Sequence, residues 1–208
     1  MNTQKLATFG IFAFIAFVLS FLGFAYMTPG YSHTVNAISE LGMAGSPYAR
    51  LWNFIGFGFV GFLVLPFAYS LLVSLRPNPG ASTISILVAI SGLGWMSLGL
   101  FTAAPGFQQS LPTTLHFMVS RVSYFSFLLA AFVFTIKLTR VPYWHSWVLF
   151  SLIMSLLGLA SFFIPPAILP GALSQRLALV VYFLWLFGMG WAVVRKPLPA
   201  YQQNFQAT

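Results

Sequence analysis

The residues best suited to chemistry gather in one polar stretch of the chain, 31–53. This stretch contains Glu40, the only acidic residue among 208, with Ser39, Arg50 and Asn53 nearby. A carboxylate beside hydroxyl, amide and guanidinium groups can act as an acid, a base or a ligand. In a second interpretation Ser39 caps a short helix and Glu40 lies in its first turn, where the helix dipole favours a carboxylate. The two interpretations are compatible.

A second polar group opens a later apolar run. His116, Ser120 and Tyr124 are spaced four residues apart, which places them on one face of a helix, with Arg121 at its edge. Fifteen residues separate Arg121 from Lys137, about 22 Å of helix and less than a bilayer core. We therefore expect Arg121 to lie inside the outer hydrocarbon boundary, facing the bundle interior and a partner.

Arg50, Arg121 and Arg176 each lie near the same end of an apolar run, in the local sequences YARLWN, VSRVSY and SQRLAL. This weak repeat predicts three helical hairpins with an arginine at the same height in each. We expect Glu40 to lie within salt-bridge distance of at least one of them, so that loop 31–50 folds back over the bundle as a lid. The remaining positive charge would attract an anion such as a lipid phosphate. Alternatively, the arginines are separate headgroup anchors.

Metal and cofactor sites are poorly supported. Glu40, His33 and His116 could form a zinc ligand set, but closely spaced ligands are missing. Two histidines on this side could serve one haem at most, and no GxSxG or SxxK motif marks a nucleophilic serine. We predict no metal site and no cofactor.

The composition is that of an integral membrane protein. Charged residues make up 5% of the chain and apolar residues 59%, with a mean hydropathy of +0.91. A soluble domain carries about 25% charged residues. The net charge of +8 comes from lysines and arginines placed mostly at the ends of apolar runs, which indicates topology signals and phospholipid contacts, not nucleic acid. The absence of cysteine excludes disulfides.

Six apolar runs are long enough to cross a membrane, which takes about 20 helical residues. The predicted fold is all-α, a bundle of six transmembrane helices. The links between the runs are short, so we predict a single domain over residues 1–208. The expected helices are 6–27, 51–74, 83–104, 115–136, 144–164 and 177–194.

The basic residues predict the orientation of the bundle. Six of them fall on one side of the predicted helices: Lys5, Arg76, Lys137, Arg140, Arg195 and Lys196. The positive-inside rule makes that side cytoplasmic, so both termini are expected inside. The predicted location is the cell membrane, in a multi-pass topology, which in a Gram-negative cell is the inner membrane.

The sequence YSHTVNAISELGMAGSPYARLWNFIGFGFVG over 31–61 resembles the DUF998 family of small six-helix membrane proteins. The residues that carry the resemblance are Ser39, Glu40, Leu41, Gly42, Pro47, Asn53 and Gly56. A second block also fits, with Phe101, Pro105, Thr113, Thr114, Leu115 and His116. The sequence departs from the family pattern at two places. The segment TAAPGFQQS lacks the aspartate that many members carry there, and Ser120 stands where many members carry a histidine. The loop is more distantly similar to the Frag1/DRAM/Sfk1 group, which is linked with lipid handling.

Two functional classes follow. The first is a protein with an outer-facing polar pocket that binds a lipid headgroup or another anion through Arg50, Arg121 and Arg176. Its further predicted ligand-binding residues are Asn53, Ser39, Ser120 and Tyr124. The second class is a lipid-modifying hydrolase or transferase with Glu40 and His116 as acid and base. A small transporter is a third option. The predicted partners are membrane phospholipids and not nucleic acid, and the oligomeric state is left open.

Overall fold

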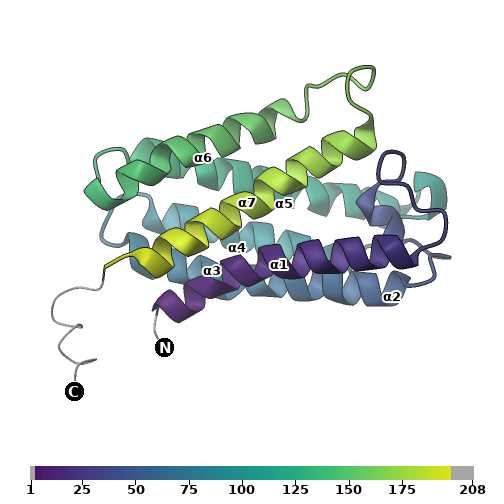
Figure 1. Ribbon diagram of the computed structural model, residues 1–208, viewed down its shortest axis with the longest axis horizontal. Coiled ribbons are helices and arrows are strands. Elements are labelled where there is room, and N and C mark those ends of the chain that lie inside the picture. Colours follow the sequence, from purple (N-terminus) through teal and green to yellow (C-terminus); the bar gives the residue numbers. More distant parts are fainter. Residues whose placement is uncertain (1–2, 198–208) are drawn as a thin grey trace.

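The computed structural model describes residues 3–197 (Figure 1), and within them the regular structure is helical. The α-helices are α1 (Thr3–Met27), α2 (Ala49–Trp52), α3 (Val60–Leu75), α4 (Ala81–Ser97), α5 (Leu111–Lys137), α6 (Pro142–Ala160) and α7 (Gly171–Arg195). A π-helical segment, η2 (Asn53–Phe59), joins α2 to α3, so residues 49–75 form one continuous helix. Six helical spans result, and the prediction of an all-α fold is confirmed.

Five of these spans are long and apolar enough to cross a membrane, one fewer than the sequence predicts. The exception is α4, which has 17 residues and ends at Ser97, although the apolar run continues to 104. Beyond Ser97 the chain continues in turns, with the amides of Leu100 and Phe101 bonded to the Ser97 carbonyl. The hydropathy of the sequence does not indicate this change from helix to turn, because the residues after Ser97 are still apolar.

Other helix boundaries differ by several residues. α7 begins at Gly171, directly after Pro170, and so extends six residues beyond the predicted start at 177. α5 begins at Leu111 because Ser110 caps it, with the Ser110 hydroxyl accepting a hydrogen bond from the Thr113 amide at 3.2 Å. The first turns of α5 and α7 contain polar residues, so they lie outside the apolar runs from which the helix boundaries were predicted.

The six spans pack as a closed ring. Neighbouring spans along the chain contact each other, and α1 also contacts α7, which closes the ring. Aromatic rings fill the interior. Trp95 of α4 stacks on Tyr182 of α7 with centroids 5.7 Å apart, and Phe17 of α1 stacks on Phe183 at 4.0 Å. The interior between α1, α4 and α7 is therefore closed by side chains.

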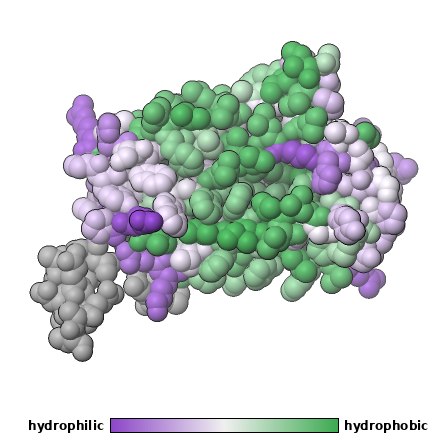
Figure 2. Space-filling view, in the orientation of Figure 1, coloured by the Kyte–Doolittle hydropathy of each residue, from purple (hydrophilic) through white to green (hydrophobic). Residues whose placement is uncertain are grey.

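The surface carries a belt of apolar side chains between two more polar ends (Figure 2). The exposed large apolar residues belong to all six spans, for example Leu19, Phe62, Ile86, Leu129, Leu149 and Val180. Such a surface is unstable in water and stable in lipid. Together with the five long apolar helices, it indicates a multi-pass membrane protein.

The two ends of the bundle differ in composition. α1 begins and α7 ends at the same end (Figure 1), where the Gln4 side chain donates to the Lys196 carbonyl at 2.9 Å. We call this the basic end, because it carries Lys5, Arg76, Lys137, Arg140, Arg195 and Lys196. The opposite end carries the first loop, 28–48, and the link between α6 and α7. We call it the cavity end.

Candidate functional site

The first loop covers the cavity end as a lid, as predicted. Its short 3-10 helix η1 (Ile38–Gly42) packs against α1 and α7. Ile38 and Leu41 are 2% and 1% exposed, so they attach the loop to the bundle through buried apolar contacts. We refer to residues 31–43 as the lid.

Two side chains of α7 hold the lid in place. The Arg176 guanidinium donates to the Tyr31 hydroxyl at 2.8 Å and to the Asn36 carbonyl at 3.0 Å. The amide oxygen of Gln175 accepts a hydrogen bond from the Ile38 backbone at 2.8 Å. Arg176 also lies over the ring of Phe21, 5.5 Å from its centroid. Arg176 therefore has a structural role between the lid and α7.

Tyr31 completes this contact. Burial raises the pKa of Tyr31 to about 12, although the neighbouring Arg176 charge opposes the change. The phenol therefore stays protonated over the physiological range. It can donate to the Ala37 carbonyl, 3.3 Å away, while it accepts from Arg176.

Glu40 organises the lid from within. Its carboxylate accepts hydrogen bonds from the Ala37 backbone at 2.6 Å and from the Asn36 side chain at 2.8 Å. Glu40 thus lies in the first turn of a short helix, as one interpretation of the sequence predicts. The N-cap position belongs to Ala37 and not to Ser39.

The predicted salt bridge of Glu40 is wrong. Within residues 3–197, no ion pair joins Glu40 to Arg50, Arg121 or Arg176. The physical reason is that donors of the lid itself occupy the carboxylate. Arg176 reaches the same loop but bonds to the neutral carbonyl of Asn36.

A cavity of about 400 Å³ lies beneath the lid; we call it the main cavity. Its walls come from η1, the end of α4, the first half of α5, the link 161–170 and the start of α7, and they are mostly apolar. The lining includes predicted residues, namely Ser39, His116, Ser120, Arg121 and Tyr124. It also includes residues that the sequence analysis missed, among them Trp95, Ser161, Phe162, Ser174, Gln175 and Tyr182.

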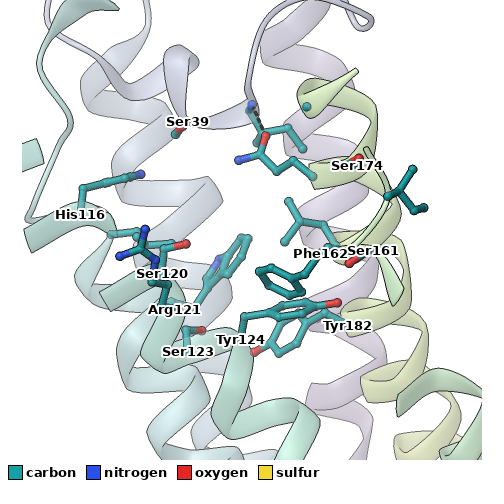
Figure 3. Close-up of a pocket in the computed structure, with 18 of the residues that line it drawn as sticks. Ser39, His116, Ser120, Arg121, Ser123, Tyr124, Ser161, Phe162, Ser174 and Tyr182 are labelled. Carbon is teal, nitrogen blue, oxygen red and sulfur yellow. Dashed lines mark hydrogen bonds between the residues drawn. The ribbon is translucent and has the colours of Figure 1, made fainter. Parts of the chain in front are cut away.

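Figure 3 shows how these side chains lie. His116, Ser120 and Arg121 form one wall, on α5, and Ser161, Phe162 and Ser174 lie across the cavity from them. Ser39 of the lid lies at the top of this view, and the rings of Tyr124 and Tyr182 form the floor. The polar groups therefore lie mostly near the lid and along the α5 wall, above an aromatic floor.

His116 has a fixed orientation. The side chain is 5% exposed, and its Nδ1 lies 2.7 Å from the carbonyl oxygen of Phe101, in the turns that follow α4. A carbonyl oxygen only accepts hydrogen bonds, so Nδ1 carries the proton. In the neutral ring, Nε2 is then an acceptor.

Arg121 has no protein partner among the described residues. It lines the main cavity and is exposed at its edge. The expectation of a partner is therefore wrong for the described residues, and Arg121 faces the interior only in that it lines this cavity. The hydroxyl of Ser120 and the amide nitrogen of Gln175 likewise have no hydrogen-bond partner within residues 3–197.

Arg50 and Asn53 lie elsewhere. They line a second cavity of about 480 Å³, between the segment that follows the lid and the start of the second span. The Asn53 side chain donates to the Gly42 carbonyl at 3.0 Å and so fixes the end of η1. The three arginines therefore do not form one site: Arg121 borders the main cavity, Arg50 the second cavity, and Arg176 holds the lid.

The alternative chemistries find little support in the geometry. Glu40 does not line the main cavity, whereas His116 does. Their role as acid and base remains a prediction. In the part of the chain that the structure describes, no three His, Asp or Glu side chains lie close enough together to hold a metal ion.

The fold and the cavity define a class: a polytopic helical membrane protein whose first loop closes a mostly apolar cavity at one end of the bundle. The chain belongs to the family described as protein of unknown function (DUF998), whose model matches residues 11–192. The predicted membership of this family is thereby confirmed. No curated protein and no solved structure matches the chain.

Proposed function

We propose that this protein binds a membrane phospholipid in the main cavity, with the phosphate at Arg121 and apolar atoms against the aromatic floor. The observation that carries the proposal is the guanidinium of Arg121, which borders a mostly apolar cavity without a partner among the described residues. An arginine at membrane depth is costly unless it is paired or solvated. A lipid phosphate supplies the missing acceptors.

Size and chemistry support a ligand of this kind. A volume of about 400 Å³ falls within the range of roughly 300–1,000 Å³ found for small-molecule sites, which is the size class of a lipid headgroup and not of the acyl chains. Guanidinium binds phosphate through two parallel hydrogen bonds. The hydroxyl of Ser120 and the free amide nitrogen of Gln175 add donors on the α5 and α7 sides of the cavity.

The orientation belongs to the same proposal. Six basic residues mark the basic end as cytoplasmic by the positive-inside rule, so both termini lie inside. The main cavity and its lid then face the outer leaflet of the cell membrane. A reporter fused after Thr208 should be active on the cytoplasmic side. Activity on the outer side would reject this orientation.

Native mass spectrometry of the purified protein with added phospholipid tests the binding. Arg121→Gln should weaken binding about tenfold or more, because a charged hydrogen bond contributes about 1.5–3 kcal/mol. Arg50→Gln is the matched control, since Arg50 lines the second cavity. Equal binding by wild type and Arg121→Gln would contradict the proposal.

The lipid-modifying enzyme remains the second candidate because Nε2 of His116 is available as a base in the cavity. Glu40 lies outside that lining, so we favour binding over catalysis. Incubation of the protein with the bound lipid separates the two. Unchanged lipid supports the binding protein, and a product that His116→Gln fails to form supports the enzyme.

A further inference from the structure

Two side-chain atoms among the described lining of the main cavity only accept hydrogen bonds: the amide oxygen of Gln175, which accepts from the Ile38 backbone, and Nε2 of His116 in its neutral form. The other ring nitrogen is already committed to the Phe101 carbonyl at 2.7 Å. The ring points into the cavity (Figure 3), and the side chain is 5% exposed. Nothing among the described protein atoms donates to Nε2.

The Arg121 guanidinium and the Gln175 amide nitrogen have the opposite preference. Arg121 offers donors alone, and Gln175 has one free amide nitrogen because its oxygen accepts from the Ile38 backbone. The hydroxyls of Ser39 and Ser120 can do either. A phosphodiester brings acceptors, so it satisfies Arg121 and Gln175 but leaves the histidine nitrogen unpaired.

The acceptor is also held rigidly, on the same wall of the cavity as Arg121. Both residues belong to the α5 wall (Figure 3). The Phe101 carbonyl fixes the ring on one side, and Phe57 and Phe117 contact it edge-on, with centroids 6.3 and 6.0 Å away. A preorganised acceptor selects a ligand group at low entropic cost.

We propose that the ligand is an anionic phospholipid whose headgroup carries a free hydroxyl, which donates to Nε2 of His116 while the phosphate lies at Arg121. This inference rests on the proposed function and specifies its ligand class. An ammonium headgroup could also donate, but it would bring a second positive charge beside Arg121. A choline headgroup has no donor. A neutral hydroxyl donates to Nε2 of His116 and adds no positive charge near Arg121. A glycerol headgroup is the simplest headgroup that supplies such a hydroxyl.

Two lipids that differ only in this group provide the test. Phosphatidylglycerol and phosphatidylmethanol with identical acyl chains carry the same charge, but only the first has headgroup hydroxyls. The wild-type protein should bind phosphatidylglycerol about tenfold more tightly in a native mass spectrometry competition, because phosphatidylmethanol has no headgroup hydroxyl to donate to Nε2 of His116. Phosphatidylglycerol with both headgroup hydroxyls methylated controls for size and should bind like phosphatidylmethanol.

Two variants separate this inference from the proposed function. His116→Phe should bind both lipids equally, at the wild-type affinity for phosphatidylmethanol. Arg121→Gln should weaken the binding of both lipids and keep the ratio of their affinities. Equal binding by the wild type would overturn the hydroxyl inference and leave lipid binding intact. A wild type that binds neither lipid, or an Arg121→Gln variant that binds both unchanged, would overturn the proposed function itself. The wild-type ratio decides the inference even where a variant does not fold.

Discussion

The two ends of the bundle use the same residue types differently. At the basic end, Lys196 donates to the Ser74 carbonyl and lies 5.3 Å from the centroid of Trp144. Trp144 is 0% exposed and packs against Phe134, which is also 0% exposed. At the cavity end, Arg176 has several hydrogen bonds, whereas Arg121 has none within the described residues.

This contrast separates structural cations from an available one. Lys196 and Arg176 each connect two segments of the chain, and their hydrogen-bond partners are protein groups. Arg121 borders an open volume instead. The comparison teaches that the number of basic residues at an end says little about binding. What matters is whether the protein itself supplies their partners.

The largest expected effect lies at the basic end. Trp144→Ala should lower the free energy of unfolding by about 3–5 kcal/mol, because it empties a fully packed position. Phe162→Ala, at the wall of the main cavity and 49% exposed, should cost much less. Thermal unfolding of the detergent-solubilised protein measures both. Similar losses for the two variants would remove the contrast between a packed end and an open one.

Next in size is the release of the lid. Arg176→Leu removes the hydrogen bonds to Tyr31 and Asn36, so the lid should lose about 2–3 kcal/mol of local stability. Hydrogen exchange followed by mass spectrometry should show faster exchange in residues 31–43 and little change in α5. As a control, Arg195→Leu removes a basic residue that lies over Trp191 at the other end. Unchanged exchange in the lid would show that Arg176 does not hold it.

A smaller effect is expected from Glu40→Gln. The amide can still accept from the Ala37 backbone, but its NH₂ group would face the donor nitrogen of Asn36. We expect a loss of about 1–2 kcal/mol confined to the lid. Glu40→Asp, one methylene shorter, should lose at least one of the two bonds as well. Hydrogen exchange of residues 31–43 is again the measurement, and global unfolding that shifts as much as the lid would argue against a local role.

The smallest effect belongs to an exposed contact at the basic end. Arg195 lies 4.5 Å from the ring centroid of Trp191, a cation–π contact worth about 0.5–1 kcal/mol at such sites. Arg195→Gln should therefore change the melting temperature slightly and leave phospholipid binding in the main cavity unaffected. A large loss of binding would link the two ends, which the comparison treats as independent.

Much of the fold could be predicted from the sequence because apolar runs report burial in lipid directly. The end of α4 could not, because residues 98–104 are as apolar as the helix before them. Tertiary contacts hold the segment that follows the helix. A Cβ at Gly99 would lie 2.5 Å from the Asn53 carbonyl oxygen, and the Phe101 carbonyl bonds to His116. Neither contact has a signature in the local sequence.

The site was predictable in part for a similar reason. The spacing of His116, Ser120 and Tyr124 defines one helix face, and all three line the main cavity. The three arginines share a local sequence pattern, but that pattern does not predict which cavity or which neighbouring element each side chain faces. Trp95 and Tyr182 were missed because an aromatic residue in an apolar run has no feature that separates a cavity floor from ordinary packing.

The π-helical segment η2 has a geometric consequence for α2. One residue corresponds to about 100° of rotation in an α-helix, and a π segment commonly holds one residue more than regular α-helix would. Deleting one residue from Asn53–Phe59 would restore the α-helical phase and turn Trp52 away from Phe24 and Phe57, which it contacts edge-on. The length of η2 thus sets the angular position of α2, and with it the point at which the segment after the lid joins the membrane helix. An insertion or deletion there would rotate α2 and its Trp52 and leave the span below it in register.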